Sequence, residues 1–241
     1  MKISINLLLS TLGIAPTLLC AQSILIDFGD ENKQTTGQPE TWNNAHLGIV
    51  AGGNTGRLFS DMVDTEGEPT GISLDITNAF DGRNINGFGS SNFNTGGPTP
   101  YPTTATEDSF YTATAEAGIT PSDGLGILEF SGLDPAKTYT FTMYASRKAT
   151  DNRETQYDFV GENSNSVYLN AGDNIAGTVT TIGIRSTASG TISLTVQKGS
   201  NNESEYSYLG AVQINAIPEP ASAAFLFSVL SASFVILRRR R

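Results

Sequence analysis

Cysteine and histidine are almost absent from this chain of 241 residues, which holds one of each, Cys20 and His46. A zinc centre needs several cysteine or histidine ligands, and a Ser-His-Asp triad would have to use His46. The chain also lacks a Gly-x-Ser-x-Gly elbow, a phosphate-binding Gly-x-x-x-x-Gly-Lys loop and a Gly-x-Gly-x-x-Gly turn. These absences leave paired carboxylates, as in a glycan hydrolase, as the remaining catalytic chemistry, and the sequence singles out no such pair.

Basic residues are scarce in the central part of the chain. Without Lys2 and the four terminal arginines among the 14 basic residues, and without Glu219 among the 24 acidic ones, residues 22–217 carry a net charge of −14. Such a surface favours solubility and repels phosphate backbones, which argues against a nucleic-acid partner.

The N-terminus has the pattern of a secretory signal peptide, predicted over residues 1–21. Lys2 is followed by an apolar stretch at 3–19 and by the small residue Ala21. The pattern predicts export through the Sec translocon and removal by signal peptidase. Lipidation at Cys20 is the alternative, for which Leu19 is a poor preceding residue. Because Cys20 falls in this segment, the predicted mature domain has no thiol and no disulfide.

The C-terminal part combines an extended motif, an apolar run and a basic cluster. Pro218 and Pro220 flank Glu219 and cannot continue a helix. The uncharged run 221–237 would span about 25 Å as a helix, the short end of what crosses a bilayer. The cluster Arg238, Arg239, Arg240 and Arg241 predicts a cytoplasmic end. On these grounds alone, a plain C-terminal membrane anchor is an equal alternative to a processed one.

The order of motif, short span and arginine cluster resembles the PEP-CTERM sorting signal of Gram-negative bacteria. The resemblance covers residues 217–241 and implies that exosortase, a membrane cysteine transpeptidase, recognises Pro218-Glu219-Pro220 and removes the anchor. It also implies a role at the cell surface or in an extracellular matrix, since such proteins often accompany exopolysaccharide production. Because the family's signal is shared by many kinds of passenger, it implies no activity for residues 22–216.

The passenger domain, predicted over 22–216, has the pattern of an all-β fold. Short runs of alternating or β-branched residues are separated by glycine, asparagine and other turn formers. This spacing predicts one antiparallel two-sheet sandwich of jelly-roll type. The predicted strands are 23–28, 71–77, 109–115, 125–130, 138–146, 155–160, 166–169, 179–184, 191–197 and 206–214.

Two connections have distinctive sequences. The turn 131–137 and the Thr-Tyr-Thr-Phe strand after it resemble hairpins of galactose-binding-like and fibronectin-like extracellular modules. The segment 93–106, rich in proline, glycine and threonine, predicts a long exposed loop with polyproline character.

Candidate ligand sites follow from aromatic and acidic residues. Trp42 with Tyr101, Tyr144 and Arg147 could form a glycan-binding platform, with core packing as the alternative for the single tryptophan. Asp151 and Arg153 lie in the same loop as Arg147 and could add to that platform. Calcium prefers oxygen ligands from loops, and the candidate ligands for it are Asp27, Asp30, Asp75 and Asp81.

Three functions remain open on the sequence. The leading hypothesis is a structural or adhesive surface module without catalysis, held in the inner membrane before processing. The second is a carbohydrate-binding module with a polysaccharide partner, and the third is a glycan hydrolase that uses two carboxylates.

Overall fold

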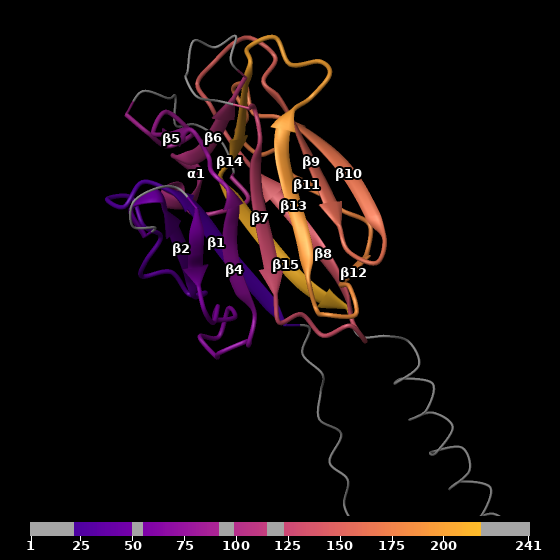
Figure 1. Ribbon diagram of the computed structural model, residues 1–241. Helices are drawn as coiled ribbons and strands as arrows, with labels where there is room; N and C mark the ends of the chain where they lie inside the picture. Colours follow the sequence, from indigo (N-terminus) through magenta and orange to yellow (C-terminus); the bar gives the residue numbers. More distant parts are fainter. Residues whose placement is uncertain (1–21, 50–54, 92–98, 115–122, 218–241) are drawn as a thin grey trace, which may run out of the picture.

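The computed structural model describes residues 22–49, 55–91, 99–114 and 123–217 (Figure 1). The predicted signal peptide at 1–21 and the predicted sorting signal at 218–241 lie outside these residues. Within the described ranges, no helix has the length and apolar character needed to cross a bilayer.

The described chain is built mainly from strands. In chain order the elements are β1 (Ser23–Gly29), β2 (Trp42–His46), the 3-10 turn η1 (Leu47–Ile49), β3 (Gly56–Phe59), β4 (Ser73–Asn78), β5 (Gly82–Asn84), α1 (Thr103–Thr106), β6 (Ser109–Ala113), β7 (Gly126–Ser131), β8 (Thr138–Tyr144), β9 (Glu154–Val160), β10 (Ser164–Asn170), β11 (Val179–Thr180), β12 (Ile184–Arg185), β13 (Ile192–Lys198), β14 (Tyr206–Leu209) and β15 (Ala211–Ile217).

Two six-stranded sheets pack face to face, which confirms the predicted β-sandwich. One has the order β11-β8-β15-β1-β2 with β12 also on β8, and the other has the order β10-β9-β13-β7-β4-β3. The pairs are antiparallel except β1 with β2, which run parallel. Phe141 of the first sheet contacts Phe130 and Phe159 of the second, with ring centroids 5.3 and 4.6 Å apart. The core therefore lies between the sheets.

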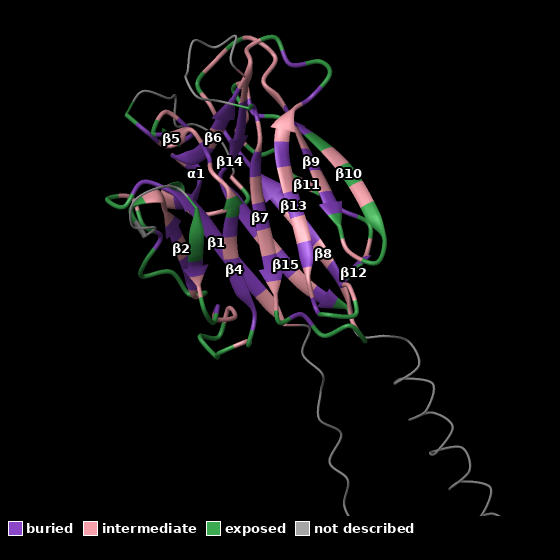
Figure 2. Cartoon of the chain, viewed as in Figure 1, coloured by how far each residue is buried: buried purple, intermediate pink, exposed green. Residues whose placement is uncertain are grey.

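The alternation of polar and apolar residues in the sequence agrees with the faces of the strands that are buried in the structure. Phe141 and Met143 of β8 are fully buried, whereas Thr140 and Thr142, which alternate with them, are only partly covered. Figure 2 shows the same alternation of buried and partly exposed positions along β7 and β13. Because successive side chains of a strand point to opposite faces, one face of each of these strands packs in the core.

Several predicted elements differ from the observed ones. The strand predicted at 179–184 is two short strands, and the strand predicted at 206–214 divides at Gly210 into β14 and β15. Gly210 lies where the chain passes from β14 to β15. A side chain would be crowded there, because a Cβ at Gly210 would lie 3.0 Å from the Tyr144 carbonyl oxygen. Strands β2, β3 and β5 were not predicted, because their sequences lack a clear apolar alternation.

The prediction of an exposed loop over 93–106 is wrong for its last part. Thr103–Thr106 forms the single helical turn α1, in which Ala105 and Thr106 are buried. The Thr106 hydroxyl donates to the carbonyl oxygens of Pro102 and Thr103, which closes the turn. Residues 93–98 of this segment lie outside the described ranges.

A third sheet, β14-β6-β5, covers one end of the sandwich. Phe110 of β6 joins it to the main core through Phe28 of β1, with ring centroids 5.4 Å apart. At the other end, Ser23 of β1 lies opposite Asn215 of β15, so both ends of the described domain leave the same edge (Figure 1). The small sheet therefore lies at the end of the domain away from the start of β1 and the end of β15 (Figure 1).

Candidate functional site

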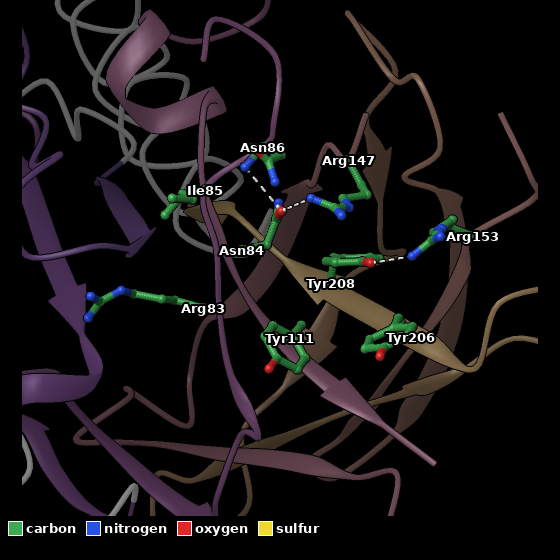
Figure 3. A pocket seen from close by; sticks show the side chains of 9 residues that line it. All are labelled: Arg83, Asn84, Ile85, Asn86, Tyr111, Arg147, Arg153, Tyr206 and Tyr208. Carbon is green, nitrogen blue, oxygen red and sulfur yellow. Dashed lines mark hydrogen bonds between the residues drawn. The ribbon is translucent and has the colours of Figure 1, made fainter. Parts of the chain in front are cut away.

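A cavity of about 370 Å³ lies against the three-stranded sheet (Figure 3). Strand pairing puts Tyr208 opposite Tyr111 and Tyr111 opposite Gly82, so these positions share one face of the sheet. We call this cavity the tyrosine–arginine cleft. Its lining residues are Arg83, Asn84, Ile85, Asn86, Tyr111, Arg147, Arg153, Tyr206 and Tyr208.

Three tyrosines line the cleft. Tyr206 and Tyr208 stand two residues apart on β14, which directs both to the same face, and Tyr206 packs edge-on against Tyr111 with ring centroids 5.8 Å apart. The ring of Tyr111 lies over Gly82, where a Cβ would come within 2.8 Å of the tyrosine hydroxyl oxygen. Tyr208 is buried, whereas Tyr111 and Tyr206 are only half-buried and keep part of their rings open.

The connection between β8 and β9 supplies two arginines to the cleft. Arg147 donates from Nη1 to Oδ1 of Asn84 at 2.8 Å. Arg153 donates from Nη1 to the Tyr208 hydroxyl at 2.7 Å, pairs through Nε with Asp151 at 3.1 Å and lies 5.6 Å from the Tyr206 ring centroid. Figure 3 shows both arginines on the same side of the cleft, with Arg83 pointing away from them.

Backbone bonds hold this connection in place. The N–H of Arg147 donates to the Ala171 carbonyl at 2.8 Å, and the N–H of Arg153 donates to Oδ1 of Asn170 at 2.8 Å. The N–H of Lys148 donates to the Asn86 carbonyl at 2.7 Å, which ties the loop to the segment after β5. Both walls of the cleft are therefore preorganised without a ligand.

The cleft keeps Tyr111 and Tyr208 neutral and Arg153 charged. Burial raises the pKa of the Tyr208 hydroxyl, and the positive charge of Arg153 only partly opposes this shift. Burial also raises the pKa of Tyr111. Burial acts against the charge on Arg153, but the contacts with Tyr208 and Asp151 outweigh it and raise the guanidinium pKa. The cleft thus places the neutral rings of Tyr111 and Tyr208 close to the charged guanidinium of Arg153.

The aromatic residues predicted as a glycan platform lie elsewhere. Trp42, Tyr101 and Tyr144 form a small cluster of their own with Leu25, Ala105 and Ala211. Tyr101 stands edge-on to both other rings, with ring centroids 5.5 Å from Trp42 and 6.2 Å from Tyr144. Trp42 is 7% exposed and Tyr144 is fully buried, and burial raises the pKa of Tyr144 to about 12.

Of the six residues predicted for the glycan platform, Arg147 and Arg153 line the cleft. The packing of Trp42 and Tyr144 matches the core alternative and leaves little ring surface for a ligand, and their ligand role stays a prediction. Asn84, Tyr111, Tyr206 and Tyr208 were not singled out by the sequence. The signal that could have pointed to the last two is the alternation Tyr-Ser-Tyr-Leu at 206–209.

The predicted calcium candidates do not share one position. Asp30 pairs with Arg83 at 2.6 Å, Asp75 pairs with Arg57 at 2.6 Å, and Asp81 accepts the Ala113 N–H at 2.7 Å. Although burial acts to raise the pKa of Asp30, hydrogen bonds from Asn32 and the charges of Arg83 and Lys33 lower it. Across the described part of the chain, no three histidine, cysteine or acidic side chains are grouped as a metal would require.

Asp27 instead belongs to a buried acid pair with Asp108. Oδ2 of Asp27 accepts the hydroxyl of Thr35 at 2.8 Å, and Oδ2 of Asp108 accepts the N–H of Asp30 at 2.5 Å. The other oxygen of each carboxyl is buried without a hydrogen-bond partner among the described residues. Burial raises the pKa of Asp27 to about 7, and burial together with the charge of Asp27 raises the pKa of Asp108 to about 8.

The lining of the cleft consists of tyrosine, arginine, asparagine and isoleucine side chains. Among the residues that the structure describes, those lining it include no carboxylate, histidine or cysteine. A second cavity of about 450 Å³ lies at Pro135, Glu162 and Arg185 and, within the described ranges, has no aromatic lining. The tyrosine–arginine cleft therefore combines apolar ring surface with hydrogen-bond donors in a way that the second cavity does not.

Comparison with known proteins assigns no family. No protein-family model matches the chain, and no curated protein matches it. Among solved structures, TmCBM61 in complex with β-1,4-galactotriose is 15% identical with a TM-score of 0.28, covering 47% of this chain and 72% of the other. The extracellular domain of ANXUR2 from Arabidopsis thaliana is 7% identical with a TM-score of 0.40, covering 82% of this chain.

A further neighbour is the arabinose-bound α-L-arabinofuranosidase MgGH51, 9% identical with a TM-score of 0.31 over 76% of this chain. The chain spans 42% of the ANXUR2 structure and 25% of the arabinofuranosidase structure. All three TM-scores lie below 0.5, so none of these likenesses assigns a ligand or an activity.

Proposed function

We propose that the β-sandwich is a saccharide-binding module without catalytic activity, and that its binding site is the tyrosine–arginine cleft. The observation that carries this proposal is the juxtaposition of half-buried Tyr111 and Tyr206 with the guanidinium groups of Arg147 and Arg153. Sugar rings have apolar faces and polar edges, so they bind where aromatic surface and hydrogen-bond donors lie side by side.

The geometry favours binding of a ligand from solvent. The cleft is open, its arginines and Asn84 are held by hydrogen bonds to neighbouring residues, and Tyr206 keeps part of its ring uncovered. Preorganised side chains lose little conformational entropy when a ligand arrives. A glycan hydrolase would need two carboxyl groups flanking the bond to be cleaved. The cleft's described lining has none, which supports binding over hydrolysis.

We further propose that the chain is exported and sorted through Pro218-Glu219-Pro220, with exosortase as a transient partner after the Sec translocon and signal peptidase. The neighbouring positions of Ser23 and Asn215 support this, because the two predicted terminal segments then join the same edge of the domain. Strand β15 is seven residues long, about 20 Å, and β14 with the cleft lies beyond its first residue. With an anchor after Ile217, the cleft would lie at the end of the domain away from the membrane.

Binding is tested on a glycan array with the full-length protein and two matched tyrosine variants. Tyr206 lies in the cleft, whereas Tyr168 of β10 is 46% exposed and lies outside its lining. We expect Tyr206→Ala to lose binding at least about tenfold, because stacking on an aromatic ring is lost, and Tyr168→Ala to bind as the wild type. Equal binding by all three proteins, or turnover of a bound glycan, would refute the proposal.

Sorting is tested by intact mass. We expect the native protein to lack residues 1–21 and the segment from about 221 onward. Alanine at positions 218, 219 and 220 should leave export unchanged and block removal of the tail in a cell that has exosortase. Cleavage at the same place in this variant would contradict the role of the motif.

A further inference from the structure

Arg147 has no acidic partner within the described part of the chain. Its single side-chain hydrogen bond there is to Asn84, whereas Arg153 pairs with Asp151 and Arg83 pairs with Asp30. A guanidinium has five N–H donors, so several of those on Arg147 remain for a ligand. The nearby Asp173 carboxylate accepts the N–H of Ala149 at 3.1 Å and makes no ion pair with Arg147.

This free cation is unusual in so acidic a protein. Residues 22–217 carry a net charge of −14, and an arginine in that field would ordinarily attract one of the many carboxylates. The hydrogen bond to Asn84 instead holds the guanidinium in the cleft, beside the tyrosines. Next to it in sequence, Lys148 is exposed and adds a second positive charge to the same loop.

We infer that the cleft selects a saccharide that carries a carboxylate, of the uronic acid class, and that Arg147 binds that carboxylate. This inference rests on the proposed saccharide-binding function. A carboxylate is planar and matches two parallel N–H groups of a guanidinium, which gives a short, charge-assisted contact. The strongly negative domain disfavours densely charged polymers, so isolated carboxylates on an otherwise neutral chain fit best.

The tyrosines and the arginine have separate roles in this arrangement. Tyr206 and Tyr111 would contact the ring of the uronic acid or of its neighbour, a contact that neutral sugars also make. Arg147 would contact the carboxylate, which only the acidic sugar carries. Affinity for any saccharide therefore measures the contribution of the tyrosines. The ratio of the affinities for the acidic and neutral forms measures the contribution of Arg147.

The experiment compares uronic-acid oligosaccharides with the same oligosaccharides after carboxyl reduction. Both are titrated into the full-length protein by calorimetry, together with a sulfated neutral oligosaccharide of equal length. The variants are Arg147→Gln, Arg147→Lys and the control Arg185→Gln, whose side chain is exposed and pairs with Glu162 outside the cleft. A folded state is confirmed for each by circular dichroism.

We expect the wild type to bind the acidic form at least about tenfold more tightly than the reduced form. Arg147→Gln should bring this ratio close to one, Arg147→Lys should restore part of it, and Arg185→Gln should leave it unchanged. Equal affinity of the wild type for both forms, or preference for the sulfated ligand, would overturn the assignment of a carboxylate. Absence of binding to every saccharide would instead refute the proposed function.

Discussion

The buried acid pair makes the stability of this domain depend on pH. Asp27 is 3% exposed and Asp108 is 1% exposed, and each has one oxygen without a partner among the described residues. Burial is the main cause of their raised pKa values, about 7 for Asp27 and about 8 for Asp108. The charge of Glu107 raises both values further, and that of Lys33 lowers the pKa of Asp108.

The direction of the effect follows from proton linkage. An unfolded chain releases these protons near pH 4, whereas the folded domain holds them up to about pH 7 to 8. The unfolded state therefore binds fewer protons in this window, and the free energy of unfolding falls as pH rises. The stability contributed by the protonated pair is complete below about pH 4 and is lost as pH rises through 7 and 8.

The size of the effect can be tested with Asp108→Asn. A shift of the Asp108 pKa from 3.8 to about 8 lowers the free energy of unfolding by on the order of 5 kcal/mol at a pH where Asp108 is ionised in both the folded and the unfolded state. Relaxation and water entry reduce this cost, and an amide keeps the acceptor for the Asp30 N–H. At pH 9 we expect the free energy of unfolding of the variant to exceed that of the wild type by about 2 kcal/mol. At pH 5 we expect the two proteins to have similar free energies of unfolding.

The assay is thermal and urea unfolding of the full-length protein at pH 5, 7 and 9. For a domain of this size, about 2 kcal/mol corresponds to a rise of about 4 to 8 °C in Tm. The control is Glu162→Gln, which removes one negative charge from an exposed carboxylate. A wild type that is more stable at pH 9 than at pH 5, or a gain for Asp108→Asn that the control equals, would refute the reasoning.

Three further substitutions test the site and the core. Gly82→Ala should weaken saccharide binding about tenfold in a calorimetric titration, because its Cβ would displace the Tyr111 ring, and unchanged affinity would contradict this. Phe141→Ala should lower the unfolding free energy by about 3 to 5 kcal/mol in urea titrations, against under about 0.5 kcal/mol for Ile182→Ala, whose side chain is 64% exposed. Trp42→Ala should cost about 3 kcal/mol while leaving saccharide affinity unchanged, since its cluster is separate from the cleft; lost binding in a folded variant would restore the predicted platform.

Most strands can be predicted from the sequence because the local alternation of polar and apolar residues already indicates which side chains are buried. In β8, the alternation of threonine with Tyr139, Phe141 and Met143 marks the core face before any partner strand is known. The strands that were missed, such as Gly82–Asn84, are short and polar and gain their conformation only by pairing with β6. The terminal segments are equally a matter of local pattern, and their sorting role stays a prediction.

Only the tertiary structure decided which aromatic residues meet the arginines. Trp42 looked suited to a ligand because it is the single tryptophan among polar neighbours, yet parallel pairing with β1 puts it in a buried cluster. Tyr111 and Tyr208 come from distant parts of the chain and become neighbours only through β6–β14 pairing.

The pairing of Asp27 with Asp108 has the same origin, since each looks like an ordinary surface acid in its own segment. A strand's alternation states which face is buried, but not which strand lies beside it. Contacts between remote segments depend on the packing of the whole sandwich, and for this protein those contacts create both the cleft and the acid pair.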